Sequence, residues 1–177
     1  ARAGLESIEP LFTSIDAERS LEYFEPVLYD QMIYINDNIR LKFSDAGHIL
    51  GSSIVELWVR EAEKETKLVF SGDLGMKNRP LLKDPSYIEE ADYLIIESTY
   101  GNKIHENIGS RATRLVDVLL KTIRRGGTVV IPSFAVGRNQ ELIYELNKVY
   151  DGDERIKELL RVPVYIDSPM AISATEI

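Results

Sequence analysis

The sequence predicts an α/β fold, and two patterns along the chain support this prediction. Residues 32–70 alternate apolar and polar side chains with a period near two, as strands with one buried face do. After residue 101, short apolar segments alternate with amphipathic helical segments, which is typical of units that build a parallel sheet. With 177 residues, 44% of them hydrophobic, the chain is long enough to bury a sizeable core.

Antiparallel strands are expected in the first half of the chain. Turn residues at 36–38 separate the first two strands, and a charged loop precedes the fourth. The segment 93–98, YLIIES, is apolar on both faces through its middle, as in a strand buried between layers. The expected antiparallel strands are 32–35, 39–43, 53–59 and 67–70.

Helices and strands are expected to alternate in the second half. Ser110 can cap a helix that Gly126 and Gly127 stop. Further helices are expected at 139–150 and 153–160, and strands at 128–132 and 162–167. The change of pattern across the polar stretch 101–110 predicts a boundary, so that 1–101 and 102–177 are parts of two domains.

Composition and charge narrow the classes of function. The absence of cysteine excludes disulfides, thiolate zinc ligands and a cysteine nucleophile. No apolar run approaches the roughly 20 residues that span a bilayer, so we expect a cytoplasmic protein without a membrane partner. The net charge of −8 argues against a nucleic-acid partner, yet residues 111–125 are basic and bound cations can add positive charge. A solvated helix face explains that basic segment equally well.

Three segments place a reactive side chain where an expected strand ends. His48 lies in DAGHILGS, Asp73 in FSGDLG and Glu97 in ESTYG. Each alone has an ordinary structural explanation, such as a turn aspartate that bonds its own backbone. A carboxylate at the end of a buried strand, however, is costly unless it is paired or hydrogen-bonded. Three such groups at the strand ends of one layer predict a common site.

Five segments, taken in order, resemble one family. DAGHILGS, FSGDLG, ESTYG, IPSFAVGRNQEL and IDSPMA are similar to motifs of the metallo-β-lactamase-fold nucleases that carry a β-CASP domain. The resemblance is greatest to the RNA-processing branch related to the cleavage and polyadenylation specificity factor endonuclease, and it runs from about Thr13 to the last residue. It implies that 1–101 form part of a metallo-β-lactamase αββα sandwich and that 102–177 begin the parallel sheet of a β-CASP domain.

The resemblance also implies roles for individual residues. It makes His48 a zinc ligand and Asp73 the carboxylate that bridges two zinc ions, roles that suit an imidazole and a carboxylate. Glu97 matches the acidic motif of the family's catalytic centre, where it is thought to orient a histidine from a later part of the chain. Arg138 precedes a helix whose free N–H groups can hold a phosphate, which makes it a candidate RNA contact. A structural ion pair is an equal alternative for Arg138.

The activity implied is hydrolysis of phosphodiester bonds in single-stranded RNA by a hydroxide that two zinc ions activate. The family's principal motif, His-x-His-x-Asp-His, has no counterpart in the 177 residues. We therefore expect an internal fragment that alone holds metal weakly, or not at all, and is inactive. Two other functions remain open: a metallo-β-lactamase-fold hydrolase of thioesters or lactones, and a non-catalytic RNA-processing scaffold. A homodimer is also left open.

Overall fold

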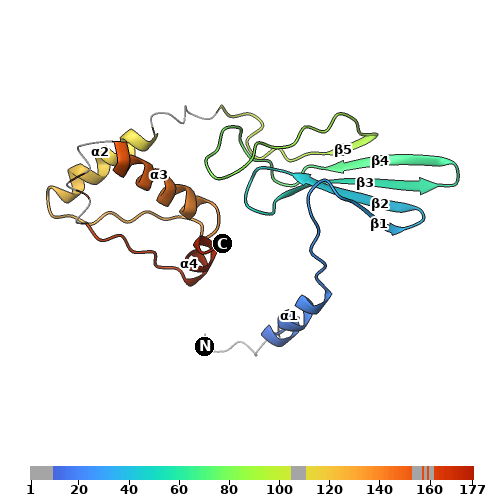
Figure 1. The fold of residues 1–177 in the computed structure, drawn as a ribbon, viewed down its shortest axis with the longest axis horizontal. Coiled ribbons are helices and arrows are strands. Elements are labelled where there is room, and N and C mark those ends of the chain that lie inside the picture. Colours follow the sequence, from blue (N-terminus) through green and yellow to red (C-terminus); the bar gives the residue numbers. More distant parts are fainter. Residues whose placement is uncertain (1–9, 105–110, 153–156, 158, 160–161) are drawn as a thin grey trace, which may run out of the picture.

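The computed structural model describes residues 10–104, 111–152, 157, 159 and 162–177. Its strands form one five-stranded sheet in the order β1-β2-β3-β4-β5, and helices α2, α3 and α4 form a second group beside it (Figure 1). The predicted α/β class is therefore confirmed at the level of a mixed fold, with a mostly antiparallel sheet followed by helices.

The sheet contains the four predicted antiparallel strands. They are β1 (Met32–Asn36), β2 (Ile39–Asp45), β3 (Ser53–Glu61) and β4 (Lys64–Phe70), and consecutive strands pair with each other. The period of two in the sequence fixes the register, because a slip by one residue would exchange the two faces of a strand. The fifth strand, β5 (Tyr93–Ile95), pairs in parallel with β4.

The two faces of the sheet have different surroundings. On one face Ile54 and Val69 are buried and pack with Ala46 against Leu74 and Ile88 of the segment that follows β4. The opposite face carries rows of apolar side chains that are at most partly buried. The register aligns them as Leu41, Leu57 and Leu68 in one row and Phe43, Val55 and Phe70 in the next.

A buried carboxylate lies on the covered face. Glu56 is 2% exposed, and its oxygens accept hydrogen bonds from Lys42 Nζ at 2.8 Å, Lys67 Nζ at 2.6 Å and Ser44 Oγ at 3.1 Å. Burial raises the pKa of Glu56, but the hydrogen bonds and charges of the two lysines together lower it by more. The pKa of Glu56 therefore lies below its ordinary value. Pairing therefore keeps this carboxylate charged inside the sheet.

The prediction for the segment 93–98 is only partly right. Its strand is limited to β5, and the expected burial is wrong, because Tyr93, Leu94 and Ile95 are 61%, 57% and 49% exposed. β5 lies at the edge of the sheet, where it pairs with β4 alone. An apolar sequence on both faces indicates a strand that can be buried, but burial depends on a second layer that the local sequence does not contain.

The helical prediction is confirmed for two segments. α2 (Arg111–Ile123) and α3 (Arg138–Gly152) cover the expected ranges, although the proposed cap Ser110 and most of 153–160 lie outside the described residues. Val116 and Leu120 of α2 pack with Leu159 in a small core. A short α4 (Pro169–Thr175) begins at the N-cap Ser168.

The expected strands 128–132 and 162–167 are not strands in the structure. Both segments run without ladder pairing among the described residues, and Val130 and Tyr165 are each 84% exposed. The parallel sheet predicted for 102–177 is therefore not formed in the described part of the chain. A strand needs neighbours for its backbone groups, and apolar sequence alone does not provide them.

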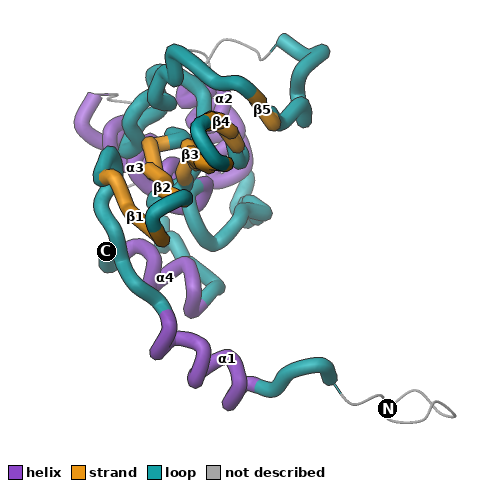
Figure 2. The backbone as a smooth tube through the Cα atoms, turned by 90° about the vertical axis from the view of Figure 1, so that its right-hand side faces the viewer, coloured by secondary structure: helices purple, strands orange, loops and turns teal. Residues whose placement is uncertain are grey.

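The N-terminal helix stands apart from the sheet. α1 (Ser14–Ser20) has a capping box between Thr13 and Asp16 and continues into a 3₁₀ turn, Leu21–Tyr23. It buries no residue and projects away from the rest of the chain (Figure 2). Within the part of the chain that the structure describes, no helix has the length and apolar character needed to cross a membrane.

The Glu56 cluster predicts a large effect of a small substitution. Glu56→Gln should lower the free energy of unfolding by about 2 to 3 kcal/mol, because Lys42 and Lys67 lose their shared charged acceptor. Urea unfolding at neutral pH measures this change, with the exposed Glu63→Gln as matched control. Equal stability of the two variants would contradict a stabilising role for the buried carboxylate.

Candidate active site

His48 lies in a turn that closes immediately after β2. The N–H of Ala46 donates to Ser52 O at 3.1 Å, and Ser52 Oγ accepts from the N–H groups of His48 at 3.0 Å and Ile49 at 3.2 Å. Gly47 adopts a φ of +64°, a backbone conformation that would be strained for a residue with a side chain. The turn is thus held by its own backbone and Ser52, and it leaves the His48 side chain exposed.

The loop that carries Asp73 rests directly on this turn. The N–H of Gly75 donates to Ala46 O at 2.8 Å, so the backbones of the two motifs are hydrogen-bonded. A Cβ atom on Gly75 would overlap the carbonyl group of Gly47, so only glycine allows this approach. The Asp73 side chain is exposed on the same loop.

Glu97 joins the third motif to the second. Its Oε1 accepts from the N–H of Leu74 at 2.7 Å and its Oε2 from the N–H of Thr99 at 3.3 Å. Ser71 Oγ in turn accepts from the N–H of Glu97 at 3.0 Å. The Leu74 N–H above all, then Thr99 and, more weakly, the charge of His48, hold the pKa of Glu97 below its ordinary value. Glu97 is therefore a carboxylate at neutral pH.

The structure thus brings three of the four predicted site residues to one region. The Gly75–Ala46 hydrogen bond links the segment of Asp73 to that of His48, and the Leu74–Glu97 hydrogen bond links it to that of Glu97. Ser71, which the sequence analysis did not single out, supports this arrangement from the end of β4. Its position immediately after the strand, inside the FSGDLG motif, was the available signal.

The chemistry of these donors suits a metal only in part. His48 and Asp73 offer an imidazole and a carboxylate, which are zinc ligands, whereas both Glu97 oxygens already accept backbone hydrogen bonds. Glu97 therefore fits a supporting role better than a ligand role. Among the described residues, no group of three or more histidine and acidic side chains could hold a metal ion.

Arg138 begins α3 and lies near the His48 turn without belonging to it. Its Nη1 is 2.9 Å from Glu141 Oε2, so the ion pair left open by the sequence is present. The Arg138 side chain is nevertheless 53% exposed. A Cβ atom on Gly137, one residue earlier, would lie 3.0 Å from Cγ2 of Ile49, which places the start of α3 beside the turn of His48.

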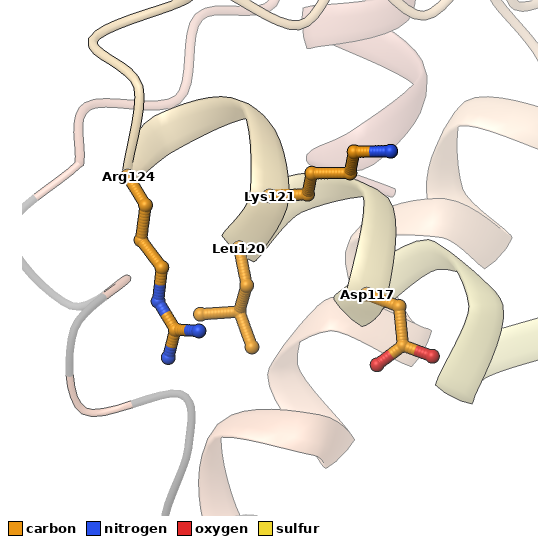
Figure 3. A pocket seen from close by; sticks show the side chains of 4 residues that line it. All are labelled: Asp117, Leu120, Lys121 and Arg124. Atoms are coloured by element: carbon orange, nitrogen blue, oxygen red, sulfur yellow. The ribbon is translucent and has the colours of Figure 1, made fainter.

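The basic segment noted in the sequence forms α2 and lies elsewhere. An open hollow of about 390 Å³ lies against α2, lined by Asp117, Leu120, Lys121 and Arg124 (Figure 3). None of the predicted site residues lines it. The hollow therefore adds no chemical group to the region around His48.

Comparison with known proteins gives relatives for most of the chain. Ribonuclease TTHA0252 of Thermus thermophilus is 39% identical over 163 residues, which is 92% of this chain and 35% of the relative. An RNase J-like protein of Methanocaldococcus jannaschii is 36% identical over 92% of this chain and 37% of the relative. Cleavage and polyadenylation specificity factor subunit 3 of Dictyostelium discoideum is 33% identical over 91% of this chain and 20% of the relative.

These alignments cover nearly all of this chain but only part of each relative. The chain spans little more than a third of the length of the first two proteins, at 35% and 37%. A search against family profiles gives no match.

The contact between the two glycine-containing loops predicts a strong substitution effect. Gly75→Ala should lower the free energy of unfolding by about 3 kcal/mol, because the Gly47 backbone must move to admit the methyl group. Gly101→Ala is the matched control, since its Cβ would meet no atom closer than Ser98 O at 3.4 Å. Urea unfolding compares them, and a Gly75→Ala variant as stable as the control would refute the close approach.

Proposed function

We propose that the intact protein cleaves single-stranded RNA, because the chain belongs to the metallo-β-lactamase-fold nucleases that carry a β-CASP domain. The reaction is hydrolysis of phosphodiester bonds. The observation that carries the proposal is the hydrogen-bonded contact of the His48, Asp73 and Glu97 segments, because it brings together the segments that carry an imidazole and two carboxylates.

In this proposal each residue has a separate task. His48 and Asp73 would be ligands to zinc, and Asp73 could serve two ions because both of its carboxylate oxygens can act as donors. Glu97 does not bind metal but orients a histidine from another part of the intact protein, as carboxylates beside zinc sites do. The low pKa of Glu97 supports this task, since a carboxylate accepts the N–H of an imidazole.

The zinc pair would supply acidity to the attacking water and stabilise negative charge on the phosphate. This chain's own residues hold the ligands in position: Ser52 fixes the turn of His48, and Gly75 fixes the loop of Asp73 against it. Two ligands do not complete a zinc site. We therefore propose that the remaining ligands come from other parts of the intact protein.

The RNA is proposed to contact Arg138. The Arg138 side chain is 53% exposed to solvent although it pairs with Glu141. Guanidinium N–H groups are therefore left to bind a phosphate. Its position at the start of α3, beside the turn of His48, supports a contact close to the metal ligands. A single strand fits such a site better than a duplex, because its backbone can follow a narrow groove.

The division of the chain follows the same proposal. Residues 1–101 would belong to a metallo-β-lactamase αββα sandwich and 102–177 to the start of a β-CASP domain. The partly exposed apolar rows of Phe43, Val55 and Phe70 support the first part, since a second layer would bury them. Unpaired apolar segments at 128–132 and 162–167 support the second, because they could join a parallel sheet with further strands.

The proposed activity is tested with the intact protein and labelled single-stranded RNA. Asp73→Asn should reduce cleavage at least about 100-fold, since even partners of metal ligands contribute roughly 10- to 100-fold. A chelator should abolish cleavage and zinc should restore it. Asp37→Asn, an exposed turn substitution of the same kind, should cleave as the unchanged protein does.

Other outcomes of this assay favour the alternative functions. Hydrolysis of a thioester or lactone without RNA cleavage would indicate a different hydrolase of this fold. RNA binding without cleavage of any of these substrates would indicate a scaffold. Cleavage that survives both the chelator and Asp73→Asn would refute the metal-dependent mechanism.

The 177-residue chain alone should bind zinc weakly and cleave no RNA. His48 and Asp73 provide two ligands, which is fewer than the four of a tetrahedral zinc site. Isothermal titration calorimetry of the chain with zinc measures the affinity. Stoichiometric binding at micromolar or tighter affinity would contradict the prediction and would require further ligands within this chain.

A further inference from the structure

One ion pair joins the sheet part of the chain to the helical part. Arg79 lies in the segment between β4 and β5, and its Nη1 is 2.8 Å from both Oε1 and Oε2 of Glu141 in α3. The side chains are 18% and 12% exposed, so the pair is largely shielded from water. Loss of one partner from such a pair leaves an uncompensated charge, so the geometry resists separation.

Glu141 connects Arg79 to the candidate RNA contact. The Oε2 atom of Glu141 also lies 2.9 Å from Nη1 of Arg138, one turn earlier on α3. Glu141 stands in the first turn of the helix, where the helix dipole favours a negative charge. Two guanidinium groups therefore share one carboxylate, and Arg79 fixes the carboxylate that holds Arg138.

A second contact fixes the same end of α3. Gly137 packs beside Ile49 in the turn of His48, while Arg79 extends from the segment that begins with the loop of Asp73. The start of α3 is thus held from both motif segments at once. Gln140 extends this arrangement, since its Nε2 donates to Ala171 O at 3.2 Å in α4.

We propose that Arg79 is a positioning residue for RNA binding. Its ion pair with Glu141, named here the latch, holds the start of α3 against the loops of His48 and Asp73. The latch thereby sets the distance between Arg138 and the proposed metal ligands. The effect on RNA rests on the proposed function, whereas the latch itself rests on the contacts of Arg79, Glu141 and Ile49 alone.

The latch is tested by a distance measurement in the full 177-residue chain. The chain has no cysteine, so spin labels on Glu63→Cys, in the turn between β3 and β4, and on Lys148→Cys in α3 form a unique pair. Both positions are exposed. Double electron–electron resonance should give one narrow distance distribution, and Arg79→Ala should replace that peak by a broad distribution.

Two further variants identify the cause of any change. Arg60→Ala is the matched control. Arg60 is exposed, and its ion pair with Glu65, which is longer at 3.7 Å, lies within the sheet. Glu141→Gln should broaden the distribution as Arg79→Ala does, and the double variant should be no broader than either single variant, since both remove the same pair. Narrow peaks in both single variants, or effects that add, would overturn the latch.

Folding of each variant is checked by circular dichroism before its distances are compared. If Arg79→Ala does not fold, Arg79→Lys replaces it. Lysine keeps the charge but cannot hold both carboxylate oxygens in the planar geometry of a guanidinium, so the distribution should still broaden. A narrow peak in the folded Arg79→Lys and Glu141→Gln variants would overturn the proposal.

The positioning role is tested separately with the intact protein. Arg79→Ala should raise KM for RNA about tenfold, the equivalent of about 1.4 kcal/mol, and change kcat less. A merely structural role would lower the active fraction, and hence kcat, with KM unchanged, and that result would overturn the positioning role. If the unchanged intact protein cleaves no RNA, the proposed function fails, and the distance measurement still decides on the latch.

Discussion

The arrangement of the site depends on one contact between two backbones. Gly75 lies against Gly47 so closely that no Cβ atom fits, and its N–H donates to Ala46. Because backbone atoms define this contact, the separation of the two loops does not vary with side-chain conformation. The neighbouring N–H of Leu74 then binds Glu97. The backbone segments of His48, Asp73 and Glu97 are consequently held together by residues that carry no reactive group themselves.

The sheet gives this contact a rigid base. β2 and β4 both run antiparallel to β3, and β5 runs parallel to β4. The three strands β2, β4 and β5 therefore end on the same side of the sheet. The buried Glu56, held by two lysines and a serine, fixes the register of the central strands from inside. A shift by one residue would separate Glu56 from Lys42 and Lys67, so the pairing that keeps the charge buried also favours one alignment of the strand ends.

The local sequence predicted most of the individual strands and helices correctly. The strands of 32–70 and the helices α2 and α3 follow from side-chain periodicity, because each element displays its own pattern. The exposure of β5 and the unpaired segments 128–132 and 162–167 did not follow, since burial and pairing depend on neighbouring layers. The pair of Arg79 and Glu141 spans 62 positions with no shared motif, so no sequence pattern indicated it.

Charge is the remaining constraint on the proposed RNA-binding site. The net charge of −8 opposes a polyanion, so attraction must be local. At the start of α3, Arg79 and Arg138 share the single carboxylate of Glu141, which leaves one positive charge in excess beside the His48 turn. The side chains of His48 and Asp73 would add bound cations in the proposed site. In the proposed site a phosphate would thus meet this one excess positive charge together with the bound cations, and the proposed latch would hold the charge beside them.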